Sequence, residues 1–294
     1  MDESSRLTER FEEHRSHLRA VAYRMLGSLS EAEDAVQEAW LRLDRSDSSE
    51  IENLGGWLTT VVGRVCLNML RSRETRREDS IDAYPTDPAA GREDTVDPEH
   101  EAMLADSVGL ALLVVLDRLA PAERLAFVLH DMFSVPFDDI APMIEKTPAA
   151  ARQLASRARR RVKGVPLVPD ADLTRQRRVV DAFLAATRGG NFDALVTLLH
   201  PGVVLTADKA VGPSPAPLVI SGAVTVATGA MAAMQRALST QTALVNGVVG
   251  LAMAPRGQLF LVLAFTVKDD LITEIDVIAE PERLRELELA VLDA

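Results

Sequence analysis

The densest cluster of chemically informative side chains lies at residues 149–163, where six residues are basic and none is acidic. The apolar residues of this segment recur at helical spacing, so the polar ones share the opposite face of one helix. That face presents Arg152, Gln153, Ser156, Arg157 and Arg160. Arginine and glutamine can pair in a bidentate manner with guanine and adenine edges in the major groove of DNA. Because a merely solvated face rarely carries six cations without an acid, the pattern favours contact with DNA.

A helix-turn-helix would position this face. We expect a helix to start at Pro121, and a short supporting helix to span residues 137–145. Thr147 and Pro148 have the residue types of an N-cap and a first helical residue for the basic helix. Two helices joined by a short turn, the second of them basic, are typical of this motif. Pro142 lies inside the supporting helix, where proline costs about 3 kcal/mol, so we expect that helix to be short or kinked.

Two earlier helices carry polar groups that could bind a partner. The helix over residues 32–43 has one apolar face and leaves Asp34, Gln37 and Glu38 outside. A solvated face is the usual explanation of such residues. The next long helix ends in four arginines, Arg71, Arg73, Arg76 and Arg77. These arginines either contact DNA or complement the dipole of their helix, and the pattern alone favours neither explanation.

Composition divides the chain into three parts. Residues 79–101 form an acidic connector with three prolines, and residues 165–172 form a second, shorter break. We therefore expect a helical bundle at 1–78, a helix-turn-helix domain at 102–164 and a third domain at 173–294. The fold class is thus multi-domain, with two all-α domains followed by an α+β domain that has a curved antiparallel sheet.

The third part starts with helices and continues with short, valine-rich runs. We expect strands at 203–206, 218–221, 243–253, 258–268 and 271–279, with a helix at 223–237 and a last amphipathic helix at 281–292.

Charge and composition exclude several classes of protein. The net charge of −12 argues against unaided DNA binding, because the field of the whole chain repels phosphates. One cysteine, Cys66, and five scattered histidines make a structural metal site improbable, so no metal or cofactor is expected. No apolar run approaches the roughly 20 residues that span a bilayer, and the N-terminus lacks the apolar core of a signal peptide. We expect a cytoplasmic protein without a membrane partner.

Two segments resemble a known family. Residues 19–43, RAVAYRMLGSLSEAEDAVQEAWLRL, resemble region 2 of the extracytoplasmic-function group of the sigma-70 family. Residues 118–163, which include RLAPAERLAFVLHDMF and TPAAARQLASRARRRVK, resemble region 4 of the same family. This resemblance implies a promoter-recognition subunit of bacterial RNA polymerase, not an enzyme. Its partners would be core RNA polymerase and promoter DNA.

The resemblance also implies roles for individual residues. Core polymerase would be bound by Asp34, Gln37, Glu38 and Trp40. The loop at 44–53 and the helix at 57–77 would recognise and help open the −10 element, through Asn53, Trp57, Arg64, Arg71, Arg73, Arg76 and Arg77. The −35 element would be read by Arg152, Gln153, Ser156, Arg157 and Arg160. For Trp40 and Trp57, packing in the core is the simpler explanation.

The third part resembles the polyketide-cyclase-like (SnoaL-like) members of the nuclear-transport-factor-2-like fold, through residues 182–208 and 271–284. This fold is a cone whose sheet encloses a pocket, and it serves both enzymes and binding modules. A subgroup of sigma factors carries such a domain at its C-terminus. The resemblance implies that the domain modulates the activity of the sigma factor.

Chemistry in this third part would need two ionisable groups that face one pocket. The candidates are His200, Asp208, Lys209 and Asp276. Of these, Asp208 and Asp276 are the residues we expect at a pocket for a small-molecule ligand, and no residue is assigned a catalytic role. Asp276 alternates with apolar neighbours in a strand, so it points either into the cone or into solvent.

Two hypotheses follow. The favoured one is a sigma factor whose C-terminal domain is a non-catalytic regulatory or ligand-sensing module. The rival is a cyclase-like or isomerase-like enzyme fused to another kind of DNA-binding regulator. Only the sigma-factor hypothesis explains why the chain contains the residues that resemble region 2.

Overall fold

The computed structural model describes residues 3–46, 51–79, 109–211, 216–255 and 258–292. The chain forms two compact units. The first comprises Met1–Leu104 and Leu116–Arg160, and the second comprises Ala105–Val115 and Arg161–Ala294. Of the three boundaries between the units, the two that lie among the described residues fall inside helices, namely α5 (Leu110–Asp117) and α8 (Pro148–Lys163). The sequence analysis expects three domains, and that division stays a prediction, because the grouping into two compact units does not test it.

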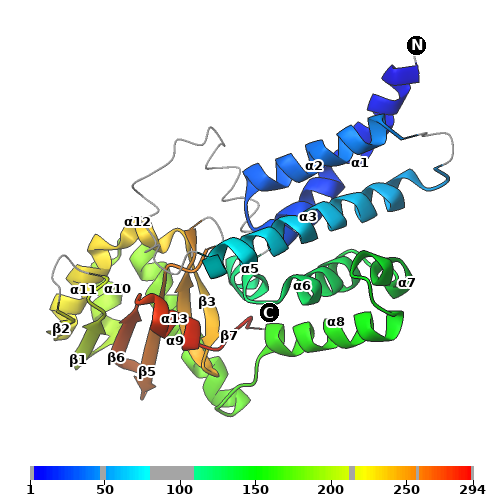
Figure 1. The fold of residues 1–294 in the computed structure, drawn as a ribbon. Helices are drawn as coiled ribbons and strands as arrows, with labels where there is room; N and C mark the ends of the chain where they lie inside the picture. The colour runs from blue at the N-terminus through cyan, green and yellow to red at the C-terminus, as the bar shows by residue number, and fades with distance from the viewer. Residues whose placement is uncertain (1–2, 47–50, 80–108, 212–215, 256–257, 293–294) are drawn as a thin grey trace. The chain divides into compact units, whose positions relative to one another are not determined.

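The first unit begins with three long helices, α1 (Glu3–Leu26), α2 (Leu29–Asp44) and α3 (Leu54–Asp79) (Figure 1). Gly27 ends α1 at a backbone φ of +73°, which glycine adopts without strain. The side chain of Ser28 then caps α2 by accepting a hydrogen bond from the backbone N–H of Glu31. Most of the periodic apolar residues of these helices are buried, as the spacing requires, while Trp40 and Met69 are half-buried.

The remaining helices of this unit build the helix-turn-helix. After α5 come α6 (Pro121–Phe127), a π-helical turn η2 (Val128–Met132), α7 (Phe137–Ile140) and a 3-10 turn η3 (Ala141–Met143). The supporting helix is short because Pro142 cannot continue it, as predicted. The basic helix α8 begins at Pro148, and the Thr147 hydroxyl accepts a hydrogen bond from Ala150 N–H at 3.2 Å, which confirms the predicted cap.

Helix α3 lies between two sets of neighbours inside the first unit. One side packs on α1 and α2, and another packs on α6, η2 and η3. A Cβ at Gly63 of α3 would lie 3.3 Å from Leu129 Cδ1 and 3.4 Å from Met143 Sδ, so glycine permits the close approach. As a result, α3 is buried on most of its circumference between Trp57 and Leu70, where the exposed residues are Arg64 and Asn68.

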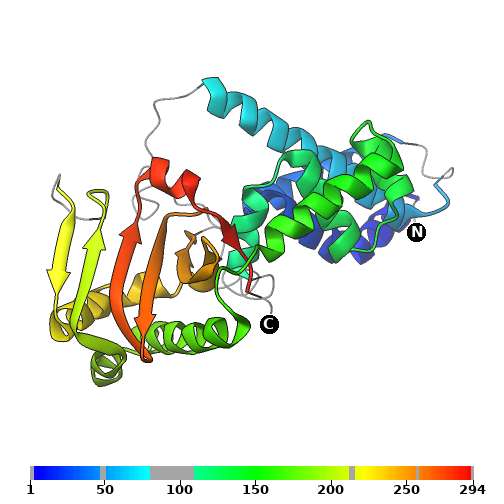
Figure 2. The ribbon, with the colours of Figure 1, turned by 90° about the horizontal axis from the view of Figure 1, so that it is seen from below.

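The second unit is an α+β domain with one seven-stranded sheet, in the order β2-β1-β6-β5-β4-β3-β7 (Figure 2). Its strands are β1 (Leu199–Ala207), β2 (Leu218–Ser221), β3 (Thr240–Val245), β4 (Val248–Met253), β5 (Leu261–Lys268), β6 (Leu271–Ile278) and β7 (Leu289–Ala290). Its helices are α9 (Asp170–Arg188), α10 (Phe192–Leu198), α11 (Ala223–Ala232), α12 (Met234–Ala237) and α13 (Pro281–Glu286).

Each face of this sheet is covered by different helices. The α9 face packs against α9 to α12, and its core includes Phe183 and Phe265, whose rings meet edge to face at 5.5 Å. The opposite face, here called the α5 face, carries Val245, Val262 and Ile278. Apolar side chains of residues 110–115, of α13 and of β7 pack on it.

The structure confirms the fold class and corrects three details. The sheet is mixed, because β1 runs parallel to β6. The predicted strand at 243–253 is a hairpin, since Asn246 and Gly247 adopt positive φ and form a two-residue turn between β3 and β4. The predicted helix at 281–292 ends at Glu286, and β7 then pairs with β3. No helix among the described residues is long and apolar enough to cross a membrane.

Candidate nucleic-acid and partner interface

Helix α8 presents its polar residues on one exposed face. Arg152, Gln153 and Arg160 are exposed, and Ser156 lies half-buried between them. Their spacing of one, four and eight residues keeps them on one side of the helix, opposite the buried apolar positions. Four of the five residues predicted for the −35 element are therefore presented together.

The fifth residue, Arg157, has an intramolecular partner. Its Nε lies 2.8 Å from Oε1 of Glu123 on α6, whose side chain is only 8% exposed, while that of Arg157 is 50% exposed. Arg159 makes a similar pair with Asp131, at 2.5 Å. Both ion pairs attach α8 to the preceding helices, so they stabilise the presentation of the face described above.

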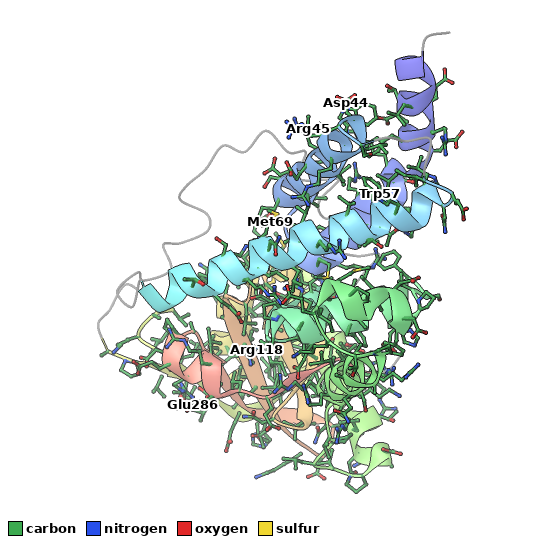
Figure 3. All side chains as sticks on the ribbon, turned by 45° about the vertical axis from the view of Figure 1, so that its right-hand side comes forward. Asp44, Arg45, Trp57, Met69, Arg118 and Glu286 are labelled. Atoms are coloured by element: carbon green, nitrogen blue, oxygen red, sulfur yellow. The ribbon has the colours of Figure 1, made fainter. Side chains whose placement is uncertain are left out.

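The exposed stripe of α3 brings together three of the residues predicted for the −10 element. Trp57, Arg64 and Arg71 are seven residues apart, which places them on one side of the helix. Arg64 and Arg71 are exposed and Trp57 is half-buried; Figure 3 labels Trp57 toward one end of α3 and Met69 further along it. Asn68, which the sequence did not single out, is exposed on the same stripe.

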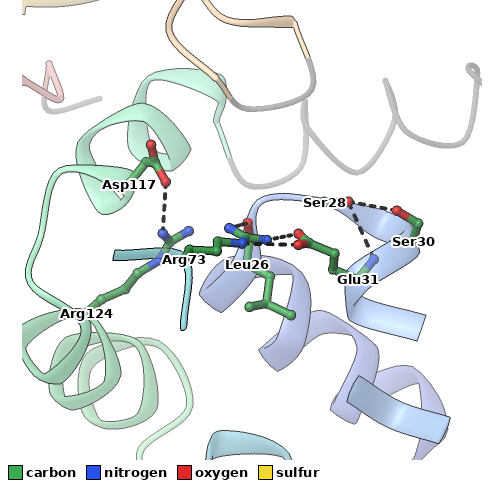
Figure 4. A network of polar contacts seen from close by, with 7 residues as sticks. All are labelled: Leu26, Ser28, Ser30, Glu31, Arg73, Asp117 and Arg124. Carbon is green, nitrogen blue, oxygen red and sulfur yellow. Dashed lines mark hydrogen bonds and ion pairs between the residues drawn. The ribbon is translucent and has the colours of Figure 1, made fainter. Parts of the chain in front are cut away.

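The other predicted −10 residues differ from this set. The Asn53 side chain caps α3 by accepting the N–H of Gly56 at 3.0 Å. Arg73 forms an ion pair with Glu31 and donates to the carbonyl oxygen of Leu26 at 3.2 Å (Figure 4). Arg73 is thus engaged in holding α3 to the junction of α1 and α2. The side chains of Arg76 and Arg77 lie outside the described residues.

Helix α2 exposes most of the residues predicted to bind polymerase. Asp34 and Gln37 are exposed, and Glu38 forms a half-exposed ion pair with Arg42 at 2.9 Å. Trp40 instead packs on the buried ring of Phe11, with ring centroids 5.0 Å apart. A surface role for Trp40 stays a prediction, and its packing favours the core explanation.

A buried arginine that the sequence did not single out lies in the same unit. The side chain of Arg124, on α6, is 2% exposed, donates from Nε to the carbonyl of Arg24 at 3.3 Å and pairs with Asp117 at 3.4 Å (Figure 4). Burial lowers the pKa of Arg124 to about 10, so the group stays charged at neutral pH. Burial also disfavours the charged form of Cys66, and it therefore raises the pKa of this thiol to about 12. No sequence period signals such a contact, because its partners are 100 and seven residues away.

In the second unit, the two carboxylates predicted at a pocket meet at one arginine. Arg283 of α13 pairs with both Asp208 and Asp276, the latter at 2.7 Å. Asp208 also accepts the N–H groups of Ala279 and Glu280 at 2.9 and 3.0 Å, so it fixes the start of α13. Burial alone would raise the pKa of Asp208, but these hydrogen bonds and Arg283 lower it below its ordinary value.

The strand alternation decides on which face Asp276 lies. Its neighbours Ile275 and Val277 belong to the core of the α9 face, so Asp276 points to the α5 face. A ligand pocket that contains both carboxylates stays a prediction, and their contacts favour a structural role. Among the described residues, no group of three or more histidine, cysteine or acidic side chains could hold a metal ion.

The comparisons with known proteins agree with this geometry. Sigma-70 region 2 matches residues 10–76, and Sigma-70 region 4 matches residues 109–162. The ECF RNA polymerase sigma factor SigJ of Mycobacterium tuberculosis is 39% identical over 93% of this chain and 91% of its own length. The probable ECF RNA polymerase sigma factor SigI of the same species is 34% identical, over 92% of each chain. The crystal structure of SigJ covers 95% of this chain and 98% of its own, with 36% identity and a TM-score of 0.46.

A helical unit with an exposed region 2 stripe and an exposed region 4 helix defines a transcription initiation factor of the sigma-70 class. Within that class, the chain belongs to the extracytoplasmic-function sigma factors. It initiates transcription with core RNA polymerase at promoter DNA. The hypothesis of an enzyme fused to another kind of DNA-binding regulator does not explain the match to Sigma-70 region 2 at residues 10–76.

Proposed function

We propose that this sigma factor binds core polymerase through Asp34, Gln37 and Glu38, the polar face of α2. We further propose that the α3 stripe of Trp57, Arg64 and Arg71 contacts the −10 element, and that the exposed face of α8 reads the −35 element. The observation that carries this assignment is the segregation of each set onto one exposed face, while Arg73 and Arg157 have carboxylate partners. Such a factor works in the cytoplasm, where polymerase and promoter meet.

Transcription in vitro tests the polymerase face. Full-length protein with Asp34, Gln37 and Glu38 changed to alanine should lose specific initiation with core polymerase. Asp34 and Gln37 are exposed and Glu38 forms only a half-exposed ion pair, so their loss should leave the fold intact. The matched control is Glu9→Ala with Glu13→Ala, which removes two exposed acids from α1. Equal activity of the triple variant and the control would overturn the assignment.

We also propose that the C-terminal domain modulates the sigma factor without catalysis, through α5. The region 4 match begins at residue 109, yet Leu110, Val114 and Val115 belong to the core of the α5 face. The N–H of Ala111 donates to Oε1 of Gln241 on β3 at 3.1 Å. Because the start of region 4 shares a hydrophobic core with the C-terminal sheet, a change in that sheet can reach region 4. A small-molecule ligand for this domain stays a prediction.

A point variant tests this modulation better than truncation at residue 172, which would uncover the apolar residues of α5. Gln241→Ala removes the acceptor of the Ala111 N–H and should change initiation from the cognate promoter. Gln235→Ala, on an exposed position of α12, is the matched control and should leave it unchanged. Identical initiation by both variants and the natural chain, with α5 still protected from hydrogen exchange, would argue against a route through α5.

A further inference from the structure

The ring of Phe137 connects the supporting helix to the proposed −35 face. Cζ of Arg152 lies over this ring, 5.6 Å from its centroid. The imidazole of His130 also stacks on Phe137, with centroids 3.8 Å apart and an angle of 28° between the planes. His130 in turn has Nδ1 at 3.0 Å from the carbonyl oxygen of Val135, which fixes the imidazole to the turn. The Phe137 ring that contacts Arg152 is therefore itself held in place by His130.

Arg152 is restrained differently from Arg157 and Arg159, two other cations of α8. Arg157 and Arg159 are held by carboxylates. Within the described part of the chain, Arg152 has no carboxylate partner, and the aromatic ring is what it contacts. A cation–π contact orients a guanidinium while it leaves all five N–H donors available, whereas the ion pairs of Arg157 and Arg159 each occupy the Nε–H donor.

We propose that Phe137 is a positioning residue for promoter recognition: it holds the Arg152 guanidinium in the orientation that pairs with a base of the −35 element. This inference rests on the role proposed above for Arg152. A free arginine side chain loses rotamer freedom when it binds a base, and a side chain that is already oriented loses less. The gain in binding affinity should appear only at DNA that carries the base with which Arg152 pairs. Phe137 therefore contributes to specificity as well as to affinity.

The test uses full-length protein bound to core polymerase and a promoter fragment that this holoenzyme selects from a randomised library. Phe137→Leu keeps the apolar volume and removes the π face, so it should weaken binding about two- to fivefold. Phe137→Tyr keeps the ring and should bind like the natural chain. In an Arg152→Ala background, Phe137→Leu should have no further effect. Phe133→Leu is the matched control, because Phe133 makes the same kind of contact with Arg24 of α1, at 5.1 Å.

Each alternative gives a different result. An equal loss from Phe137→Leu with and without Arg152, together with a lower unfolding temperature, would mean that Phe137 only stabilises the fold and would overturn the inference. Unchanged binding by Phe137→Leu, when Arg152→Ala does weaken binding, would also overturn it while the proposed role of Arg152 survives. Unchanged binding by Arg152→Ala would overturn the role of Arg152 itself.

Discussion

The Nε–H of Arg124 in α6 donates to the backbone carbonyl of Arg24, in the last turn of α1. The last carbonyls of a helix have no partner within it, and they lie at the negative end of its dipole. Arg73 of α3 satisfies a second one, that of Leu26. Two guanidinium groups from distant parts of the sequence therefore cap one helix end. Because Arg73 belongs to the region 2 match and Arg124 to the region 4 match, this cap joins the two regions in one compact unit.

Replacement of Arg124 should therefore lower the stability of the first unit. Arg124→Ala leaves the Arg24 carbonyl unsatisfied and a void in its place, at a cost of about 3 kcal/mol in the free energy of unfolding. Arg124→Met should cost less, because it fills the space and removes a buried charge whose Nη2 has no hydrogen-bond partner. Denaturation by urea measures both variants. An unchanged midpoint for Arg124→Ala would contradict the capping role.

The thiol of Cys66 should report on the packing of α3. Burial raises its pKa from an ordinary 9.0 to about 12, which lowers the thiolate fraction near pH 8 by about a thousandfold. Alkylation by iodoacetamide should therefore be slow in the natural chain and should approach the rate of a free thiol in urea. Arg124→Ala should speed the reaction by loosening the packing, although the loss of the Arg124 cation by itself raises the pKa of the thiol further. Rapid alkylation of the natural chain would show that α3 is not packed as described.

The arginines of α3 should separate into two functional kinds. Arg64→Ala and Arg71→Ala should weaken promoter binding by the holoenzyme. Each should reduce the magnitude of the slope of log affinity against log salt by about one, because each removes one contact between an arginine and a DNA phosphate. Arg73→Ala is the matched control on the same helix. It should lower the unfolding temperature and leave that slope unchanged, since Arg73 is paired with Glu31. A slope that responds to Arg73 and not to Arg64 would reverse this assignment.

The difference between Arg71 and Arg73 shows where sequence-based prediction ends for this chain. Apolar periodicity and the residue types at Thr147, Pro148 and Pro142 were sufficient for the helices, because these signals are local. The partner of Arg73 is 42 residues away, so no local pattern distinguishes it from Arg71. The end of the chain fails for a similar reason. Residues 281–292 have a helical pattern, but their last part pairs with β3, a tertiary contact that overrides local preference.

The same limit applies to the two carboxylates of the C-terminal domain. Their residue types and the family resemblance led to a pocket, and the structure places Arg283 between them. Arg283 could not be inferred from spacing, because it is 75 residues from Asp208 and lies on a helix of only six residues.

The contacts of Asp208 lead to a pH-dependent prediction. Since its pKa is lower in the folded chain than in the unfolded one, the unfolded chain binds more protons between the two values. The stabilisation by Asp208 is then fully present above its ordinary pKa of 3.8 and is lost as the pH falls through the lowered value. Asp208→Asn should cost about 1.5–3 kcal/mol at pH 7, because it breaks a charged hydrogen bond to Arg283. That cost should stay constant down to about pH 4 and shrink below it.

Urea denaturation at a series of pH values, followed by a signal from the C-terminal domain, measures this difference. Glu286→Gln is the matched control, because it neutralises an exposed acid at the end of α13, the helix whose start Asp208 fixes. It should change stability little at any pH. A cost of Asp208→Asn that is already lost at pH 6 would show that the carboxylate titrates above its ordinary range, as a carboxylate in an apolar pocket would. The pH dependence of the cost of Asp208→Asn therefore distinguishes a carboxylate that anchors α13 from one that binds a ligand.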